Sequence, residues 1–221
     1  MPEPSSASAP AAEISTGAQA SATDAASALD RPVLRAIHAR RSVRAFAPKP
    51  VERQTTERLL DAAVQAPNHR LTRPWRFFVL DSAGATRDQL GQIAEDLAFQ
   101  AMPEPRDEQA RVRARSRSEE VRSVPVLVLA YSVPGRDEHE SRENYAAVAC
   151  ALQNLQLAAV EEGLVGGWST GGFPRSAAVR EAVGADSSWE FVGAVYLGYP
   201  SDTAKPVRER TGAHDFTRWL S

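Results

Sequence analysis

Four residues of a short basic segment have the types and the spacing needed to bind a phosphate group. The sequence ARRSVRAF, residues 39–46, places Arg40, Arg41, Ser42 and Arg44 directly after a predicted helix. Guanidinium groups bind phosphate through charge-assisted, bidentate hydrogen bonds, and a serine hydroxyl adds another donor. The alternative is that these cations only complement the negative end of the helix dipole. The segment alone does not decide between the two.

A second basic segment lies near the end of the sequence. KPVRERTGAHDF, residues 205–216, contains Lys205, Arg208 and Arg210 in a stretch that its proline favours as extended chain. Taken by itself, this pattern is typical of a solvated chain end.

Glycines are concentrated in GLVGGWSTGG, residues 163–172. Because glycine has no side chain, the backbone amides of such a segment can approach a flat ligand. The chain has no GxGxxG between a strand and a helix and no GxxxxGK[ST], so neither a Rossmann site nor a P-loop is indicated. Ordinary turn glycines remain the alternative.

A polar loop interrupts two apolar elements in APNHRLTRPWRF, residues 66–77. Pro67 should end the preceding helix, because the residue before a proline is pushed out of the helical region. The loop then presents Asn68, His69 and Arg73, which are more side-chain donors than a simple connection requires.

Several classes of protein and site are not expected. A net charge of −2 gives no general attraction to nucleic acid or to an anionic membrane, and no apolar run reaches the length of a transmembrane helix. The four histidines and the single cysteine form no metal-ligand spacing, and no GxSxG is present. Cys150 is predicted to be a buried structural thiol, which fits a reducing, cytoplasmic compartment. No catalytic side chain can be named.

The order of elements predicts one α+β domain over residues 30–221, after a disordered Ala/Ser-rich tail of residues 1–29. One helix, about 142–162, is apolar on almost every side, so it is expected at the centre of the fold or in a dimer interface. The other helices expected are one that ends near residue 41 and four that span about 52–66, 84–101, 106–122 and 174–183. The strands expected lie at 75–81, 124–132, 164–170 and 188–200.

The motifs resemble those of a known family when they are taken in order. ARRSVRAF, AAVQAPNHRLTRPWRFFVL, ALQNLQLAAVEEGLVGGWSTGG and LGYPSDTAKPVRER together are similar to the FMN-dependent nitroreductase family, and above all to its small (minimal) NAD(P)H nitroreductase branch. The resemblance covers about residues 30–215.

This resemblance implies a nitroreductase-like sandwich: a central, mostly antiparallel sheet flanked by helices, with one long buried helix. It also implies a homodimer with FMN sites at its interface. The cofactor-binding residues that match the family's positions are Arg40, Arg41, Ser42, Arg44, Asn68, His69, Arg73, Trp168, Ser169, Thr170, Gly171, Arg208 and Arg210. Of these, Asn68, His69 and Arg73 match positions that reach the FMN of the other subunit.

The activity that the resemblance implies is NAD(P)H oxidation with NADH or NADPH as electron donor. Hydride would pass in a ping-pong sequence through flavin N5 to a nitroaromatic, quinone or activated-alkene acceptor. Reductive dehalogenation, an oxidative flavin reaction and non-catalytic flavin binding remain alternatives.

Overall fold

The computed structural model of the chain describes residues 31–202 and 210–220. The predicted tail of residues 1–29 lies outside the described residues, and so do Lys205 and Arg208 of the second basic segment.

The chain divides into two compact units, Met1–Arg35 and Ala36–Ser221. Helix α2, Pro32–Ala39, begins in the first unit and ends in the second. The sheet, the other helices and the pockets all belong to the second unit.

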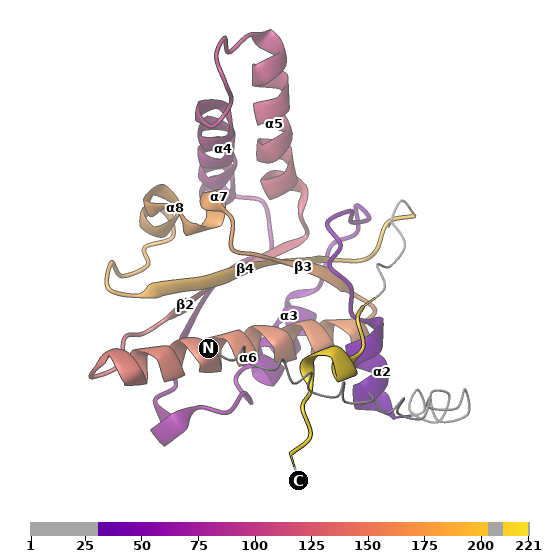
Figure 1. Cartoon of the computed structure of the whole chain (residues 1–221). Helices are drawn as coiled ribbons and strands as arrows, with labels where there is room; N and C mark the ends of the chain where they lie inside the picture. Colours follow the sequence, from indigo (N-terminus) through magenta and orange to yellow (C-terminus); the bar gives the residue numbers. More distant parts are fainter. Residues whose placement is uncertain (1–30, 203–209, 221) are drawn as a thin grey trace, which may run out of the picture. The chain divides into compact units, whose positions relative to one another are not determined.

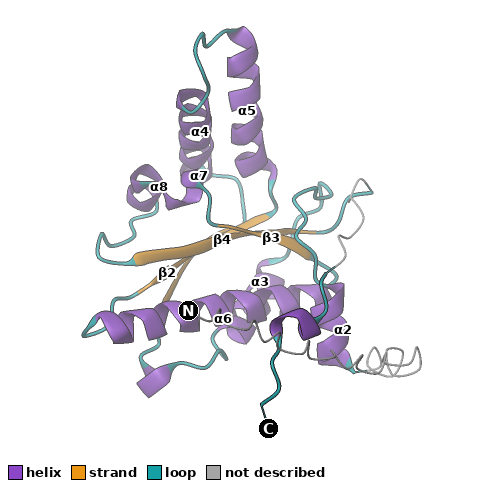
Figure 2. Cartoon of the chain, in the orientation of Figure 1, coloured by secondary structure: helices purple, strands orange, loops and turns teal. Residues whose placement is uncertain are grey.

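One four-stranded sheet forms the middle layer of the second unit (Figures 1 and 2). Its strands lie in the order β1, β2, β4, β3, and each neighbouring pair is antiparallel. The strands are β1 Trp75–Leu80, β2 Val126–Ser132, β3 Val165–Ser169 and β4 Glu190–Gly198. Every residue of β2 is buried, as expected of a continuous apolar run in a central strand. The predicted antiparallel sheet is confirmed.

Helices cover both faces of this sheet, so the predicted α+β sandwich is confirmed. Helices α3 and α6 lie on one face, and α4, α5, α7 and α8 lie on the other (Figure 1). The bounds are α3 Arg53–Ala63, α4 Ala85–Gln100, α5 Glu108–Ser123, α6 Glu138–Glu161, α7 Gly172–Arg175 and α8 Ala177–Ala182, with short 3-10 turns η1 His69–Leu71 and η2 Ala213–Phe216.

The two faces of β2 supply two separate cores, because successive side chains of a strand point in opposite directions. The even-numbered residues from Val126 to Ala130 pack in the cluster that contains α6. The odd-numbered residues from Leu127 to Tyr131 pack with α4, α5 and α8. The helices on both faces of the sheet are therefore packed against the same buried strand.

Helix α6 is longer than predicted, and one residue on it is not where it was expected. It begins four residues earlier than predicted because the Asp137 carboxylate caps its first turn, accepting a hydrogen bond from the Glu140 amide at 2.8 Å. The prediction that Cys150 is buried is wrong for the single chain, since Cys150 is exposed on the side of α6 that faces away from the sheet. Ala146, one turn earlier, is exposed on the same side.

The predicted helix at 174–183 is two short helices, α7 and α8. Ser176 separates them in an extended conformation, and its hydroxyl accepts a hydrogen bond from the Val179 amide at 3.3 Å to cap α8. The break turns the chain after β3, which places α7 beside the sheet and beside α4.

Candidate flavin site

The segment from Arg40 to Arg44 leaves α2 and lies along the edge strand β3. The Val43 amide donates to the Gly166 carbonyl at 3.0 Å, and Ser42 forms a parallel bridge with the same residue. A Cβ added to Gly167 would lie 3.1 Å from both the Val43 carbonyl oxygen and Arg44 Cγ. The sequence suggested that these glycines let a flat ligand approach the backbone. At Gly167, the space left by the missing side chain is instead occupied by this segment of the same chain.

Arg40 and Arg41 line a small pocket of about 190 Å³ at the start of this segment. Its other walls come from α6 and from the turn before β3, including the buried side chain of Gln156. Arg41 Nη1 donates to the carbonyls of Arg40, at 2.8 Å, and of His38. Arg41 Nε is buried and has no hydrogen-bond partner among the described residues. A buried donor of this kind needs an acceptor, and the pocket can hold one.

Positive charge gathers at this small pocket, and the described residues provide no carboxylate to pair with it. The pKa of Arg40 is lowered by burial and then by the repulsion of Arg210 and Arg41. The two basic segments predicted from the sequence therefore meet, with Arg210 as the C-terminal member within the described residues. No carboxylate in the described part of the chain forms an ion pair with Arg40, Arg41 or Arg210. An anion such as a phosphate ester would supply the missing negative charge.

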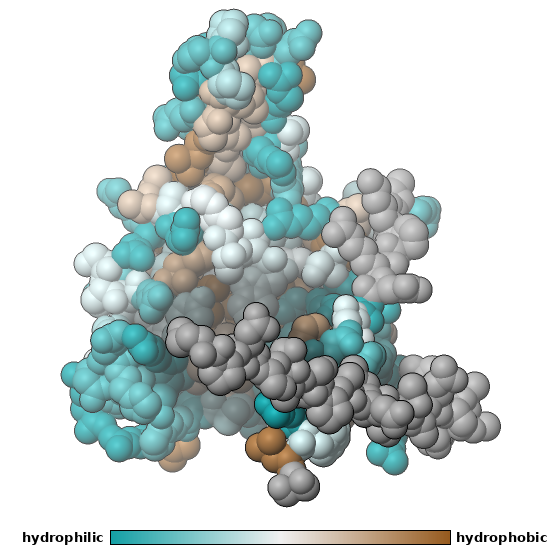
Figure 3. Space-filling view, viewed as in Figure 1, coloured by the Kyte–Doolittle hydropathy of each residue, from teal (hydrophilic) through white to brown (hydrophobic). Residues whose placement is uncertain are grey.

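A larger pocket of about 530 Å³ lies at the other end of the segment. Arg44, Ser169 and Gly171, three of the predicted cofactor residues, line it. Apolar side chains of α4 and α7 and the ring of Tyr196 supply most of its remaining wall. Apolar surface is also visible around α4 and α5 in Figure 3, whereas their far ends are hydrophilic. A pocket with apolar walls and a few polar groups at one side suits a flat aromatic ring system.

The polar side of this larger pocket is a set of paired charges. Arg44 Nη1 lies 3.0 Å from Glu120 Oε1, and Arg117 Nη1 lies 2.9 Å from Glu120 Oε2. Arg44 Cζ also lies 4.7 Å from the centre of the Tyr196 ring. Burial raises the pKa of Tyr196 to about 12, and the charge of Arg44 opposes this rise. The Tyr196 hydroxyl therefore keeps its proton at neutral pH.

Two predicted residues of the β3 segment do not line either pocket. The indole of Trp168 packs against the core on the α6 side, in space left by Gly193, where an added Cβ would lie 2.0 Å from Trp168 Nε1. Thr170 is exposed at the end of β3. Any contact of Trp168 with a ligand in these pockets must therefore involve its backbone.

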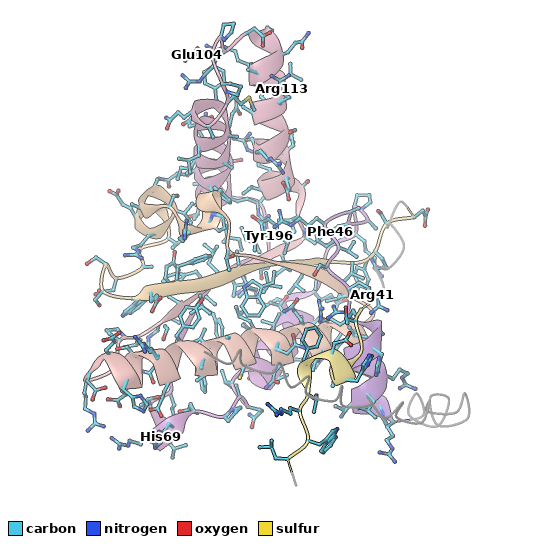
Figure 4. All side chains as sticks on the ribbon, in the orientation of Figure 1. Arg41, Phe46, His69, Glu104, Arg113 and Tyr196 are labelled. Carbon is cyan, nitrogen blue, oxygen red and sulfur yellow. The ribbon has the colours of Figure 1, made fainter. Side chains whose placement is uncertain are left out.

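The polar loop lies elsewhere in the single chain. His69 Nδ1 is 2.8 Å from Glu143 Oε1, near the start of α6, and Asn68 Oδ1 accepts from the Arg73 amide at 3.0 Å. Glu143 is thirteen residues before Gln156, which corresponds to about 20 Å along the helix. Figure 4 shows His69 and Arg41 well apart. One chain therefore does not bring Asn68, His69 and Arg73 to the small pocket.

Sequence reasoning missed four polar residues that line the pockets, namely Gln156, Arg117, Glu120 and Tyr196. Gln156 could have been found, because it is a polar residue in an apolar helix. Asn154, another polar residue of this helix, donates to the Ala62 carbonyl at 3.4 Å and ties α6 to the end of α3. Nothing in the sequence singles out Tyr196 from other strand residues or Glu120 from other charged residues of α5.

The described residues contain no three His, Cys, Asp or Glu side chains that could hold a metal ion together. Across those same residues, no helix combines the length and the apolar character needed to cross a membrane.

Comparison with known proteins places these features in a family. The model of the nitroreductase family matches residues 37–199. "Putative NAD(P)H nitroreductase YfhC" of Bacillus subtilis is 30% identical over 179 residues, which is 81% of this chain and 89% of that protein. The 5,6-dimethylbenzimidazole synthase of Rhodospirillum rubrum is also 30% identical, over 78% of this chain and 84% of that protein.

A solved structure shares the fold at lower identity. The FMN-dependent nitroreductase NfnB from Mycobacterium smegmatis, solved in complex with NADPH, superposes with a TM-score of 0.69 at 21% identity, over 87% of this chain and 100% of that one. With the family model matching most of the chain and a relative at 30% identity over four fifths of it, the chain belongs to the nitroreductase family.

Proposed function

We propose that this protein is an FMN-dependent NAD(P)H oxidoreductase. The cofactor is FMN, NADH or NADPH is the electron donor, and the acceptor is a nitroaromatic compound, a quinone or an activated alkene. The cofactor and the donor are those named for relatives of the same family or fold.

The observation that carries this proposal is the positive charge at the small pocket, which no carboxylate within the described residues pairs. Arg40, Arg41 and Arg210 have no carboxylate partner among the described residues, and Arg41 Nε is a buried donor without an acceptor. A phosphate dianion supplies both the charge and the acceptors. The residues present therefore fit the phosphate end of FMN. Ser42, the next residue of the segment, is exposed and is not among the residues that line this pocket.

The rest of the segment fits the other end of the cofactor. The five residues from Arg40 to Arg44 are joined by four Cα-to-Cα steps, which in extended chain span up to about 13 Å. In FMN, a ribityl chain joins the phosphate to the ring. The charged pocket at one end of the segment suits the phosphate, and the larger apolar pocket at the other end suits the ring. In this assignment Arg44 and the backbone of Ser169 to Gly171 lie beside the ring.

FMN held at this site would supply hydride transfer between the nicotinamide and the acceptor. The chain contributes binding and environment to this chemistry. The apolar wall of the larger pocket excludes water from the ring, Arg44 places a cation near it, and the neutral Tyr196 hydroxyl offers a hydrogen-bond donor. Donor and acceptor use one site in turn, so the kinetics are ping-pong.

We also propose that the protein is a homodimer with an FMN site at each side of the interface. The loop at residues 68–73 is exposed and holds Arg70, Leu71 and Arg73 at positive φ, a conformation that side chains other than glycine adopt only at a cost. Leu71 is 71% exposed. In the proposed dimer, this loop brings Asn68, His69 and Arg73 of one subunit to the FMN of the other, which accounts for its distance from the pockets of its own chain.

Other flavin chemistry is the second candidate. The relatives named "Putative NAD(P)H nitroreductase YfhC" and 5,6-dimethylbenzimidazole synthase are equally identical to this chain, so identity does not separate a reductase from a synthase.

An anaerobic experiment with separate half-reactions tests the proposed function. NADH or NADPH should bleach the visible spectrum of the FMN-loaded protein when no acceptor is present. After the nicotinamide is removed, a nitroaromatic compound or a quinone should restore the spectrum in stoichiometric amount. A loaded protein that NAD(P)H reduces but neither acceptor reoxidises would favour the second candidate. A loaded protein that NAD(P)H does not reduce would be a flavin-binding protein without this activity.

A further inference from the structure

The carboxylate of Glu120 is shared between two arginines at the larger pocket. Its two oxygens lie 3.0 Å from Arg44 and 2.9 Å from Arg117. The Glu120 side chain is 23% exposed, compared with 42% for Arg44 and 62% for Arg117. Ion pairs that are partly shielded from water are stronger than fully solvated ones. Glu120, the least exposed of the three side chains, is therefore the fixed centre of this group.

Arg44 is held from two directions, and its charge is partly neutralised. Glu120 contacts its guanidinium group, and the Tyr196 ring lies beneath it at 4.7 Å. Arg40 and Arg41, in the same basic segment, have no such carboxylate partner within residues 31–202 and 210–220. Among the described residues, the cation of the larger pocket is therefore paired with a carboxylate, whereas Arg40 and Arg41 of the small pocket are not.

We propose that Glu120, acting through Arg44, lowers the reduction potential of the flavin bound in the larger pocket. This inference rests on the proposed function, because it requires the FMN ring to lie beside Arg44. Reduction adds negative charge to a flavin, and a nearby cation stabilises the reduced form. A carboxylate that pairs with this cation weakens the stabilisation. Glu120 is a positioning residue, since it touches Arg44 and Arg117 and not the reacting atoms.

The consequence is a flavin that is a stronger reductant for its acceptor. A change in charge at Glu120 should alter the ratio of oxidised to reduced flavin at a fixed potential by roughly tenfold, which corresponds to about 30 mV for a two-electron couple. The sign follows from electrostatics. Loss of the carboxylate raises the potential, and loss of the second arginine lowers it.

The test is the midpoint potential of the FMN-loaded protein, measured anaerobically against a reference dye. Glu120→Gln keeps the shape of the side chain and removes its charge, so its potential should be about 30 mV more positive than that of the wild type. Glu119→Gln is the matched control. It removes the same charge from the preceding residue of α5, which is exposed. Within the described residues, the Glu119 carboxylate forms no ion pair. Its potential should equal that of the wild type.

A second variant gives a shift of opposite sign. Arg117→Gln removes a cation from the same group and leaves Glu120 to pair with Arg44 alone, so the potential should become more negative. Loosening of the pocket cannot produce opposite shifts from substitutions of the two partners of one ion pair. If Glu120→Gln does not retain FMN, the potential of Arg117→Gln alone tests the inference. The Arg117 side chain is exposed, so its replacement leaves no cavity.

The outcomes separate this inference from the proposed function. Potentials of Glu120→Gln and Arg117→Gln equal to that of the wild type, in a protein that binds FMN and is reduced by NAD(P)H, overturn only the inference. Equal shifts for Glu119→Gln and Glu120→Gln overturn it as well, because they reflect the net charge of α5. A protein that binds no FMN overturns both.

Discussion

At the scale of single residues, the side chain of Arg41 gives the strongest indication of an anion-binding site. Two of its donors are satisfied by backbone carbonyls at the end of α2, and Nε is buried without a partner. Beside it, Arg40 is repelled by both Arg41 and Arg210. Such an arrangement is unfavourable in the empty protein and becomes favourable when an anion binds.

Replacement of Arg41 should therefore weaken binding of FMN specifically. In Arg41→Gln, the dissociation constant for FMN should rise by roughly 10- to 150-fold, the equivalent of a charged hydrogen bond worth about 1.5 to 3 kcal/mol. Riboflavin, which lacks the phosphate, should bind the variant as it binds the wild type. Equilibrium fluorescence titration with both ligands measures this.

Arg53→Gln is the control for that titration, because Arg53 is an exposed arginine that pairs with Asp81. Its affinity for FMN should be that of the wild type. Equal losses of FMN and riboflavin affinity in Arg41→Gln would contradict a phosphate contact.

At the scale of elements, one buried arginine joins three of them on the face of the sheet that carries the larger pocket. Arg87 of α4 is 4% exposed and donates to the carbonyls of Leu80 at the end of β1, at 2.6 Å, and of Val121 and Val124 at the end of α5, at 2.9 and 2.7 Å. It thus closes the α4–α5 pair onto the sheet. Carbonyls at the end of a helix otherwise lack donors.

Loss of this arginine should destabilise the whole domain. Arg87→Met fills a similar volume and leaves the buried carbonyls unpaired, so the free energy of unfolding should fall by roughly 2 to 4 kcal/mol. Chemical denaturation of the two proteins measures the difference. Arg115→Met, at an exposed position on α5, should cost less than about 0.5 kcal/mol. Similar losses in the two variants would show that Arg87 does not join these elements.

The start of α6 predicts a dependence of stability on pH. Hydrogen bonds from Arg136, by side chain and then backbone, lower the pKa of Glu140, and the hydrogen bond from the Glu140 amide lowers the pKa of Asp137. A depressed pKa stabilises the folded state above the unfolded-state value, about 4.3 for Glu and 3.9 for Asp. This contribution is lost as pH falls through the folded-state pKa.

The thermal midpoint of Glu140→Gln should accordingly be lower than that of the wild type at neutral pH. The gap should begin to narrow below about pH 4.5 and continue to close at more acid pH, because the wild-type carboxyl then takes up a proton. Thermal unfolding measured across this range provides the comparison. A gap of constant size would mean that the Arg136 contact does not stabilise the fold.

The elements and the residues differed in how far the sequence predicted them. Apolar runs such as β2 predicted the strands, and the motif order predicted the family. The start of α6 was missed because capping by Asp137 outweighs the polar composition of the residues after it. Arg87, Glu120 and Tyr196 could not be predicted, because their partners lie far away in the sequence and are brought near only by folding.

At the scale of the whole molecule, two exposed surfaces bear on the proposed dimer: one side of α6 and the loop at residues 68–73. Ala146 and Cys150 are small, uncharged residues on the exposed side of α6, and small side chains allow a second helix to approach closely. The proposed dimer uses this surface.

A large charged side chain on this surface should separate the subunits. Cys150→Arg should be monomeric in light scattering and should bind FMN weakly, because the loop of the second subunit is then missing from each site. Cys150→Ala should remain dimeric and should bind FMN as the wild type does. A dimeric Cys150→Arg, or a monomer with full affinity for FMN, would contradict the shared site.

The most direct measurement of the central claim is a titration of flavin-free protein with FMN, followed by the visible spectrum and the fluorescence of the flavin. The account predicts saturable binding at one FMN per chain, much tighter than the binding of riboflavin. A protein that leaves FMN free in solution, or that binds FMN and riboflavin equally well, would contradict it.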